Sequence, residues 1–238
     1  FPTEIVPLPS KGLVYSLDNP LSAGQVEIRY MTAKDEDILT NQNYLKQGVA
    51  LDKLYEALVV GNGDGQPVNI NDMIMGDRSA VMLAARVLGY GAEYPIKVTH
   101  PETSKEIETV ADLNQLSPKV IDDSIYNNSR EFNYTLPISK KQITVQLITA
   151  VEQKAIDRDI KAQEKAGIAV RNTTTILKHT VTSIEGETDP KYISEFIDNY
   201  LLDITPDYDL TITVDIPTEN YYETLPLPIN TTFFWPRS

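Results

Sequence analysis

Two segments of the chain share one pattern, in which a strand-like alternation of apolar and polar residues runs into a threonine and then into acidic residues. The first segment covers residues 26–33 and is followed by acids at 35–37. The second covers residues 143–150, 117 positions further along, and is followed by Glu152. Threonine is a favourable helix N-cap, and acids in the first turn interact well with the positive end of the helix dipole. We therefore predict a strand that leads directly into a capped helix at both places.

The similarity extends beyond these two segments. A leucine–proline turn precedes each predicted strand, a lysine–glycine pattern follows each predicted helix, and an alternating strand that leads to a proline comes later in each half. The matching stretches are residues 8–12 with 136–140, 46–48 with 165–167, and 94–98 with 210–214. The near-constant offset favours a tandem duplication, and chance similarity between strand patterns is the alternative.

The predicted elements place the chain in the α+β class. The strands come as local hairpins and do not alternate singly with helices, which argues against a parallel α/β sheet. We predict two tandem related halves, each helical with β-hairpin elements, over residues 1–118 and 119–238. Apolar spacing predicts a helix over residues 71–88 in the first half and a solvated helix over 151–165 in the second.

The charge and composition narrow the possible functions. The 238 residues carry 34 acidic and 21 basic side chains, for a net charge of −13, which disfavours a nucleic-acid partner. No apolar run has the length of a membrane span, and no signal peptide is evident, so we expect no membrane partner. The absence of cysteine excludes thiolate chemistry and sulfur-ligated metals, and fits a protein made in a reducing cytoplasm.

Motifs for catalysis or cofactor binding are weak. The glycine-rich stretch 61–65 lacks the first and last ligands of a calcium loop and is predicted to be a loop between two helices. His100 and His179 have no G-x-S-x-G partner, so we interpret both as surface or turn histidines. No phosphate-binding glycine motif is present. We therefore predict no catalytic residue, no cofactor and no metal, and keep a hydrolase with paired acids as the enzymatic alternative.

Residues 233–236 carry a stronger indication of function than these motifs. Phe233, Phe234, Trp235 and Pro236 form an aromatic segment that contains the only tryptophan of the chain. Such a segment either closes the core of its own chain or anchors in a partner, where tryptophan and phenylalanine often contribute most of the binding energy. Both alternatives remain open from the sequence.

Five landmarks, in order along nearly the whole chain, carry a resemblance to a known family. The chain resembles the T4-type bacteriophage baseplate hub protein family, whose members are components or assembly factors of contractile tails. None of the landmarks is catalytic, and their ordered combination is what makes the resemblance specific. They are Leu-Pro-Ser-Lys-Gly-Leu-Val-Tyr at 8–15, Met-Thr-Ala at 31–33, Gly-Asp-Arg at 76–78, Leu-Gly-Tyr-Gly at 88–91 and Phe-Phe-Trp-Pro at 233–236.

The resemblance implies a structural component of the hub region of a phage tail baseplate, which binds neighbouring subunits without catalysis. Its partners would be other baseplate or tail proteins in a hetero-oligomeric assembly. Its location would be the virion tail, after assembly in the bacterial host cytoplasm. The alternative within the family is a hub assembly factor or chaperone that is absent from the mature virion.

Two details of the resemblance concern individual residues. Asp77 and Arg78 lie in a shared landmark, and we interpret them as a buried structural pair or as a contact to a neighbouring subunit. Relatives often carry a Cys-Pro-x-Cys knuckle where this chain has residues 99–102 and 215–218, without cysteine. We expect both hairpins to persist, held by apolar and cross-strand contacts in place of a metal.

Overall fold

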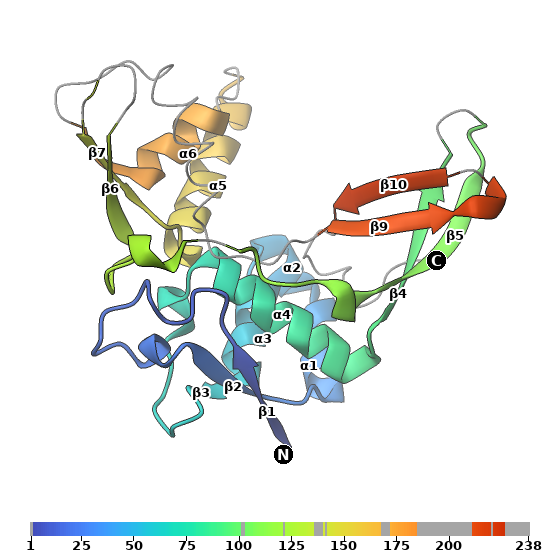
Figure 1. Ribbon diagram of the computed structural model, residues 1–238, viewed down its shortest axis with the longest axis horizontal. Coiled ribbons are helices and arrows are strands. Elements are labelled where there is room, and N and C mark those ends of the chain that lie inside the picture. Colours follow the sequence, from blue (N-terminus) through green and yellow to red (C-terminus); the bar gives the residue numbers. More distant parts are fainter. Residues whose placement is uncertain are drawn as a thin grey trace.

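The computed structural model describes residues 2–100, 103–120, 122–135, 140, 142–167, 172–184, 211–219 and 221–226. In this part of the chain, six α-helices accompany four small antiparallel sheets. Figure 1 shows how these elements are arranged. The predicted α+β class is confirmed. The aromatic segment at 233–236 lies outside the described residues.

The N-terminal sheet has three strands in the order β1-β2-β3. They are β1 (Thr3–Pro7), β2 (Gln25–Arg29) and β3 (Val59–Gly61), all paired antiparallel. Val6, Val26 and Ile28 point from the first two strands into the core. The strand predicted over 26–33 is confirmed as β2, which ends at Arg29, whereas β1 and β3 were not predicted.

Three short helices follow β2 in the chain. They are α1 (Ala33–Thr40), α2 (Gln42–Gln47) and α3 (Ala50–Leu58). Thr32 is the N-cap of α1, as predicted, and α2 ends where Gly48 adopts a φ of 69°. Glycine is favoured at this position because a side chain is strained in the left-handed region. On α3, Leu54 and Leu58 occupy one helical face and are fully buried.

The glycine-rich stretch differs from its prediction, because a strand and not a helix precedes it. β3 ends at Gly61, and the buried side chain of Asn62 then organises the loop. Asn62 Oδ1 accepts hydrogen bonds from the N–H groups of Asp64 (2.9 Å) and Gln66 (3.1 Å). The loop therefore takes its shape from one asparagine side chain.

The central helix is α4 (Met75–Tyr90), which Figure 1 shows running beside β1. It begins later than the predicted residue 71 and ends later than residue 88. The reason is a separate short 3₁₀ turn, η2 (Ile70–Asp72), capped by Asn69 and followed by two extended residues. Nine residues of α4 are buried, so packing and not propensity decides its position.

Two β-hairpins lie side by side (Figure 1). One consists of β4 (Glu93–Thr99) and β5 (Glu106–Asp112), and the other of β9 (Thr211–Ile216) and β10 (Tyr221–Pro226). The strands predicted over 94–98 and 210–214 are thus confirmed. Val98, Val214 and Tyr221 form a small apolar cluster between the hairpins. Short 3₁₀ turns follow β5 and β9, namely η3 (Leu113–Gln115) and η5 (Pro217–Glu219).

A second three-stranded sheet has the order β6-β7-β8. Its strands are β6 (Glu131–Thr135), β7 (Gln142–Gln146) and β8 (Val181–Ile184), preceded by the 3₁₀ turn η4 (Asp123–Ile125). The strand predicted over 143–150 is confirmed as β7, which ends at Gln146. Its register shifts between Thr144 and Val145, and β2 shows the same shift 117 positions earlier, between Glu27 and Ile28.

Two helices accompany the second sheet. α5 (Ala150–Lys165) has Thr149 as its predicted N-cap and buries only Ala150 and Ile156, which fits the prediction of a solvated helix. α6 (Asn172–Thr180) packs against α5 and leads into β8. One apolar core runs through both sheets, because Phe132 and Val145 belong to the same cluster as Val6.

Candidate functional site: a polar cleft and an apolar groove

The most buried ionisable side chain of the N-terminal region is Asp77, in the first turn of α4. Its Oδ1 accepts the Ser10 N–H (3.0 Å), and its Oδ2 accepts the hydroxyls of Ser10 (2.7 Å) and Tyr15 (2.6 Å). Asp77 is fully buried and Ser10 nearly so. The carboxylate therefore fastens the loop after β1 to the start of the central helix.

Tyr15 completes this fastening. Its hydroxyl oxygen accepts the N–H of Ile74 (3.0 Å), the N-cap residue of α4, whose own side chain makes no capping hydrogen bond. Burial raises the pKa of Tyr15 well above its ordinary value, and the neighbouring Asp77 carboxylate adds to the rise. The hydroxyl therefore stays protonated and remains a donor to Asp77 at any ordinary pH.

The loop that Asp77 holds also needs glycine at Gly12, which has a φ of 78°. A Cβ atom there would lie 2.3 Å from the Ser22 carbonyl oxygen, closer than any van der Waals contact allows. Only glycine can occupy this close approach of two backbone segments.

Arg78 has different partners from those of Asp77. Its guanidinium pairs with Asp52 of α3, donates to the Ile70 carbonyl (3.2 Å) and lies 4.0 Å from the centroid of the Tyr55 ring. Lys154 of α5 also contacts Asp52, at 2.7 Å. Asp52 therefore connects three helices. Two of them, α3 and α4, lie in residues 1–118, and the third, α5, lies in residues 119–238.

The junction between α4 and α5 has backbone contacts as well. Ile74 and Thr149 form an isolated antiparallel bridge, and the Met75 N–H donates to the Ile148 carbonyl (3.0 Å). Lys11 pairs with Asp123 at the surface. The two backbone contacts fix the start of α4 against the start of α5.

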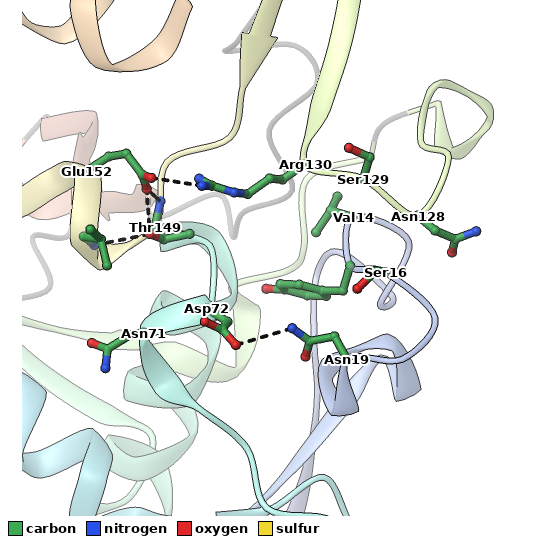
Figure 2. Close-up of a pocket in the computed structure, with 12 residues that line it drawn as sticks. Val14, Ser16, Asn19, Asn71, Asp72, Asn128, Ser129, Arg130, Thr149 and Glu152 are labelled. Carbon is green, nitrogen blue, oxygen red and sulfur yellow. Dashed lines mark hydrogen bonds and ion pairs between the residues drawn. The ribbon is translucent and has the colours of Figure 1, made fainter. Parts of the chain in front are cut away.

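A polar cleft of about 410 Å³ opens at this junction, as Figure 2 shows. Four segments meet there, and most of their side chains are polar. On one wall Asn19 donates to Asp72 (3.4 Å), and on the other Arg130 pairs with Glu152 (3.0 Å). The lining residues are Val14, Tyr15, Ser16, Asn19, Asn71, Asp72, Asn128, Ser129, Arg130, Thr149, Val151 and Glu152.

Glu152 is held by several donors at once. Its Oε2 accepts the Thr149 N–H (2.9 Å) and hydroxyl (2.6 Å), while Oε1 faces Arg130. Burial by itself would raise the pKa of Glu152, but the hydrogen bonds from Arg130 and Thr149 outweigh it and lower the pKa to about 2. An ionised, fully engaged carboxylate cannot act as a general acid near neutral pH. Within the cleft, Glu152 therefore joins Arg130 to the start of α5.

A second depression, which we call the apolar groove, has a volume of about 390 Å³. It lies between β1, one face of α4 and the segment around η3. All its lining residues except Glu4 and Asn114 are apolar. They are Glu4, Ile5, Val6, Pro7, Ala80, Leu83, Ala84, Val87, Leu88, Leu113, Asn114 and Leu116.

The two histidines match the prediction of surface or turn positions only in part. His100 lies in the β4–β5 hairpin connection, as expected for a turn, but it is buried and its ring centroid lies 5.9 Å from that of Tyr221. Packing between the two hairpins covers it, which the sequence of one hairpin cannot reveal. His179 is half-buried on α6, where its Nε2 lies 3.0 Å from Asp159 Oδ2.

The hairpins expected to persist without cysteine are both present. Apolar contacts through Val98 and Val214 join them, and cross-strand pairs such as Lys97–Glu108 (3.0 Å) support one of them. Within the described ranges, no group of three or more histidine, aspartate or glutamate side chains is placed to hold a metal ion.

Sequence reasoning singled out Asp77 and Arg78 but missed their partners. Ser10, Tyr15 and Asp52 are more than twenty positions away in the chain, and no local pattern connects them to α4. Glu152 was noted only as an acid in a first turn. The spacing of a threonine and an acid three residues later would have identified the capping box that Thr149 and Glu152 form.

Across the described residues, no helix combines the length and the apolar character needed to cross a membrane. Comparison with curated proteins and with solved structures found no significant match to either. Comparison with models of protein families found one that matches residues 11–213, described as T4 bacteriophage base plate protein. The match covers most of the chain and includes Tyr15, the central helix and both walls of the cleft. The chain therefore belongs to the T4 bacteriophage base plate protein family.

Proposed function

We propose that this protein is a structural subunit of the hub region of a contractile-tail baseplate, and that it binds neighbouring subunits without catalysis. The observation that carries the proposal is the family match over residues 11–213. The fastened joint between α4 and α5 supports it, because a subunit that sets the spacing of its neighbours must itself hold a fixed shape.

The charge of the protein fits assembly with other proteins. A net charge of −13 speeds association with basic partners and keeps the free subunit soluble, and it opposes binding to nucleic acid. We expect a hetero-oligomeric assembly in the virion tail, formed in the host cytoplasm. The aromatic segment Phe233, Phe234, Trp235 and Pro236 is proposed as an anchor in a neighbouring subunit.

We also propose that the chain consists of two tandem related halves, residues 1–118 and 119–238. The equal strand orders β1-β2-β3 and β6-β7-β8, and register shifts 117 positions apart, support this division. Limited proteolysis tests it. A first cut near residues 116–118 that leaves two resistant fragments is expected, and uniform degradation would count against the division.

Quantitative mass spectrometry of purified virions and of the infected-cell lysate tests the proposed function. A structural subunit gives a fixed ratio to other tail proteins in the virions. Presence in the lysate alone would instead identify an assembly factor that leaves before the tail is complete. Hydrolytic activity that is lost when the Glu152 carboxylate is removed would contradict a role without catalysis.

A further inference from the structure

The apolar groove exposes side chains that a soluble surface usually covers. Ile5 is 44% exposed, and Val87, Leu88 and Leu116 are half-buried. Ala84 on α4 adds only a methyl group, which leaves depth between the helix and β1. Most residues that line the groove are apolar, and Glu4 is the only charged one. Exposed apolar residues gathered in this way make the groove a candidate site for binding another molecule.

The strand that borders the groove has an open edge. β1 lies at the end of its sheet and, within the described residues, pairs only with β2. The Leu8 N–H donates to the Gly24 carbonyl, and the Tyr30 N–H donates to the Pro2 carbonyl. Hydrogen-bonded positions alternate along an antiparallel strand, so Glu4 and Val6 also face β2. Thr3 and Ile5 therefore present their N–H and C=O groups on the outer edge.

The open edge and the groove lie together. The lining of the groove comes from β1, α4 and the segment around η3, so the groove lies on the side of β1 away from β2. An extended segment placed there would extend the sheet through its backbone and fill the groove with every second side chain. A helix could fill the groove but could not pair with the edge. The length of β1 accommodates a strand of about five residues, or roughly 17 Å.

The charge of the site restricts the partner further. Glu4 borders the groove, and the whole protein is strongly acidic, so acidic residues on the added strand would be repelled. Pro7 has no N–H, which confines new backbone pairing to the half of β1 that contains Thr3 and Ile5.

We propose that the apolar groove receives an extended strand from a neighbouring baseplate subunit, with apolar residues at alternate positions and a lysine or arginine beside Glu4. The strand pairs with the outer edge of β1 and places its apolar side chains against Leu88, Ala84 and Leu116. This proposal rests on the proposed function, because it names the surface through which the subunit is held.

Incorporation into particles tests the surface. Leu88→Glu puts a charge in the groove, and Ile5→Pro removes one outward N–H while keeping an apolar residue. We expect each variant to reduce the amount of this protein in purified baseplates at least tenfold. Leu17→Glu, at an apolar residue that is 80% exposed and outside the groove, is the matched control and should be incorporated like the wild type. Circular dichroism and urea midpoints of the isolated variants establish that they fold.

The two proposals fail in different ways. Normal incorporation of folded Leu88→Glu and Ile5→Pro would overturn the groove proposal and leave the proposed function standing. Absence of the wild-type protein from virions would overturn both, since no baseplate neighbour would then exist to supply the strand.

Photo-crosslinking identifies what occupies the groove. A benzophenone amino acid replaces Leu116 in the full chain, and assembled baseplates are irradiated and analysed by mass spectrometry. A link to another baseplate protein, within a segment of alternating apolar residues next to a lysine or arginine, is the expected result. A link to residues 227–238 of the same chain, a link to a second copy, or no link at all would overturn the proposal.

Discussion

In each three-stranded sheet a strand leads into a capped helix, and we call this strand-to-helix connection a joint. At both joints an arginine pairs with an acid in the first turn of the helix, but the arginine comes from a different strand position in each. In the N-terminal sheet, Arg29 at the end of β2 contacts Asp35 through two bonds of 2.8 and 2.7 Å. In the second sheet, Arg130 reaches Glu152 from the residue before β6, the neighbouring strand. Each acid also accepts the N–H of its threonine N-cap. Both joints contain an acid that pairs with an arginine, whereas the position of that arginine in the sheet differs.

The surroundings of the two joints also differ. Asp35 is 1% exposed, whereas Arg130 and Glu152 line the open cleft. The same chemistry therefore serves a closed joint in one region and a solvated joint in the other. Because solvent screens an ion pair, the closed joint should contribute more to stability than the solvated joint.

The largest expected effect comes from removing Asp77, which fastens the loop after β1 to the start of α4. Asp77→Ala leaves the Ser10 N–H and the hydroxyls of Ser10 and Tyr15 without their buried acceptor. We expect a loss of about 3–5 kcal/mol in the free energy of unfolding, measured by urea denaturation. Asp37→Ala, at an exposed position on α1, is the control and should stay within about 0.5 kcal/mol of the wild type. A loss below about 1 kcal/mol for Asp77→Ala would show that the loop is held by other contacts.

Arg29→Ala and Arg130→Ala test whether the closed joint contributes more to stability than the solvated joint. Removal of Arg29 leaves a buried carboxylate without its cation, and we expect a loss of about 2–3 kcal/mol. The Arg130 side chain is 34% exposed, so its removal should cost about 1 kcal/mol after solvent screening. Urea denaturation of both variants under one buffer condition gives the ratio. Equal losses would mean that exposure does not distinguish the joints.

The sequence revealed local features of these joints and missed the distant ones. Thr32, Thr149 and Gly48 were placed correctly because capping and left-handed glycine depend on neighbouring residues alone. The start of α4 was wrong because Asn69 caps a separate turn, an outcome decided by the hydrogen bonds of one side chain. The strands β1 and β3 were missed because their pairing to β2 joins segments far apart in the chain.

The candidate site shows the same limit. Asp77 and Arg78 could be singled out, but their contacts with Ser10 and Asp52 depend on how α4 packs against the rest of the protein. The apolar groove was not predicted at all, since its walls come from segments more than seventy residues apart. A surface made by packing has no local sequence signal.

The pH dependence of stability tests the contribution of Glu152 to the solvated joint. The folded-state pKa of Glu152 is about 2, below its ordinary 4.5, so its ionised form stabilises the folded protein above pH 4.5. This contribution is lost as the pH falls from 4.5 toward 2. We expect Glu152→Gln to remove about 1–2 kcal/mol of that pH-dependent loss, after allowance for solvent. Urea midpoints between pH 7 and pH 3 measure it, with Glu131→Gln at an exposed strand position as the control. If the urea midpoint of Glu152→Gln fell with pH as steeply as that of the wild type, other groups would cause the loss of stability in acid. Asp35, whose pKa is also lowered, would be one example.

The smallest expected effect concerns Thr149, the N-cap of α5. Thr149 is almost fully buried, and its hydroxyl oxygen accepts the Val151 N–H (3.2 Å) while its O–H donates to Glu152 (2.6 Å). Thr149→Ala should therefore cost about 1 kcal/mol, measured as a shift in the urea midpoint. Thr149→Ser keeps the hydroxyl and should recover most of that loss, because the bonds and not the methyl group stabilise the start of α5. If serine were no better than alanine, packing of the threonine methyl group against the junction, and not its hydrogen bonds, would account for the loss.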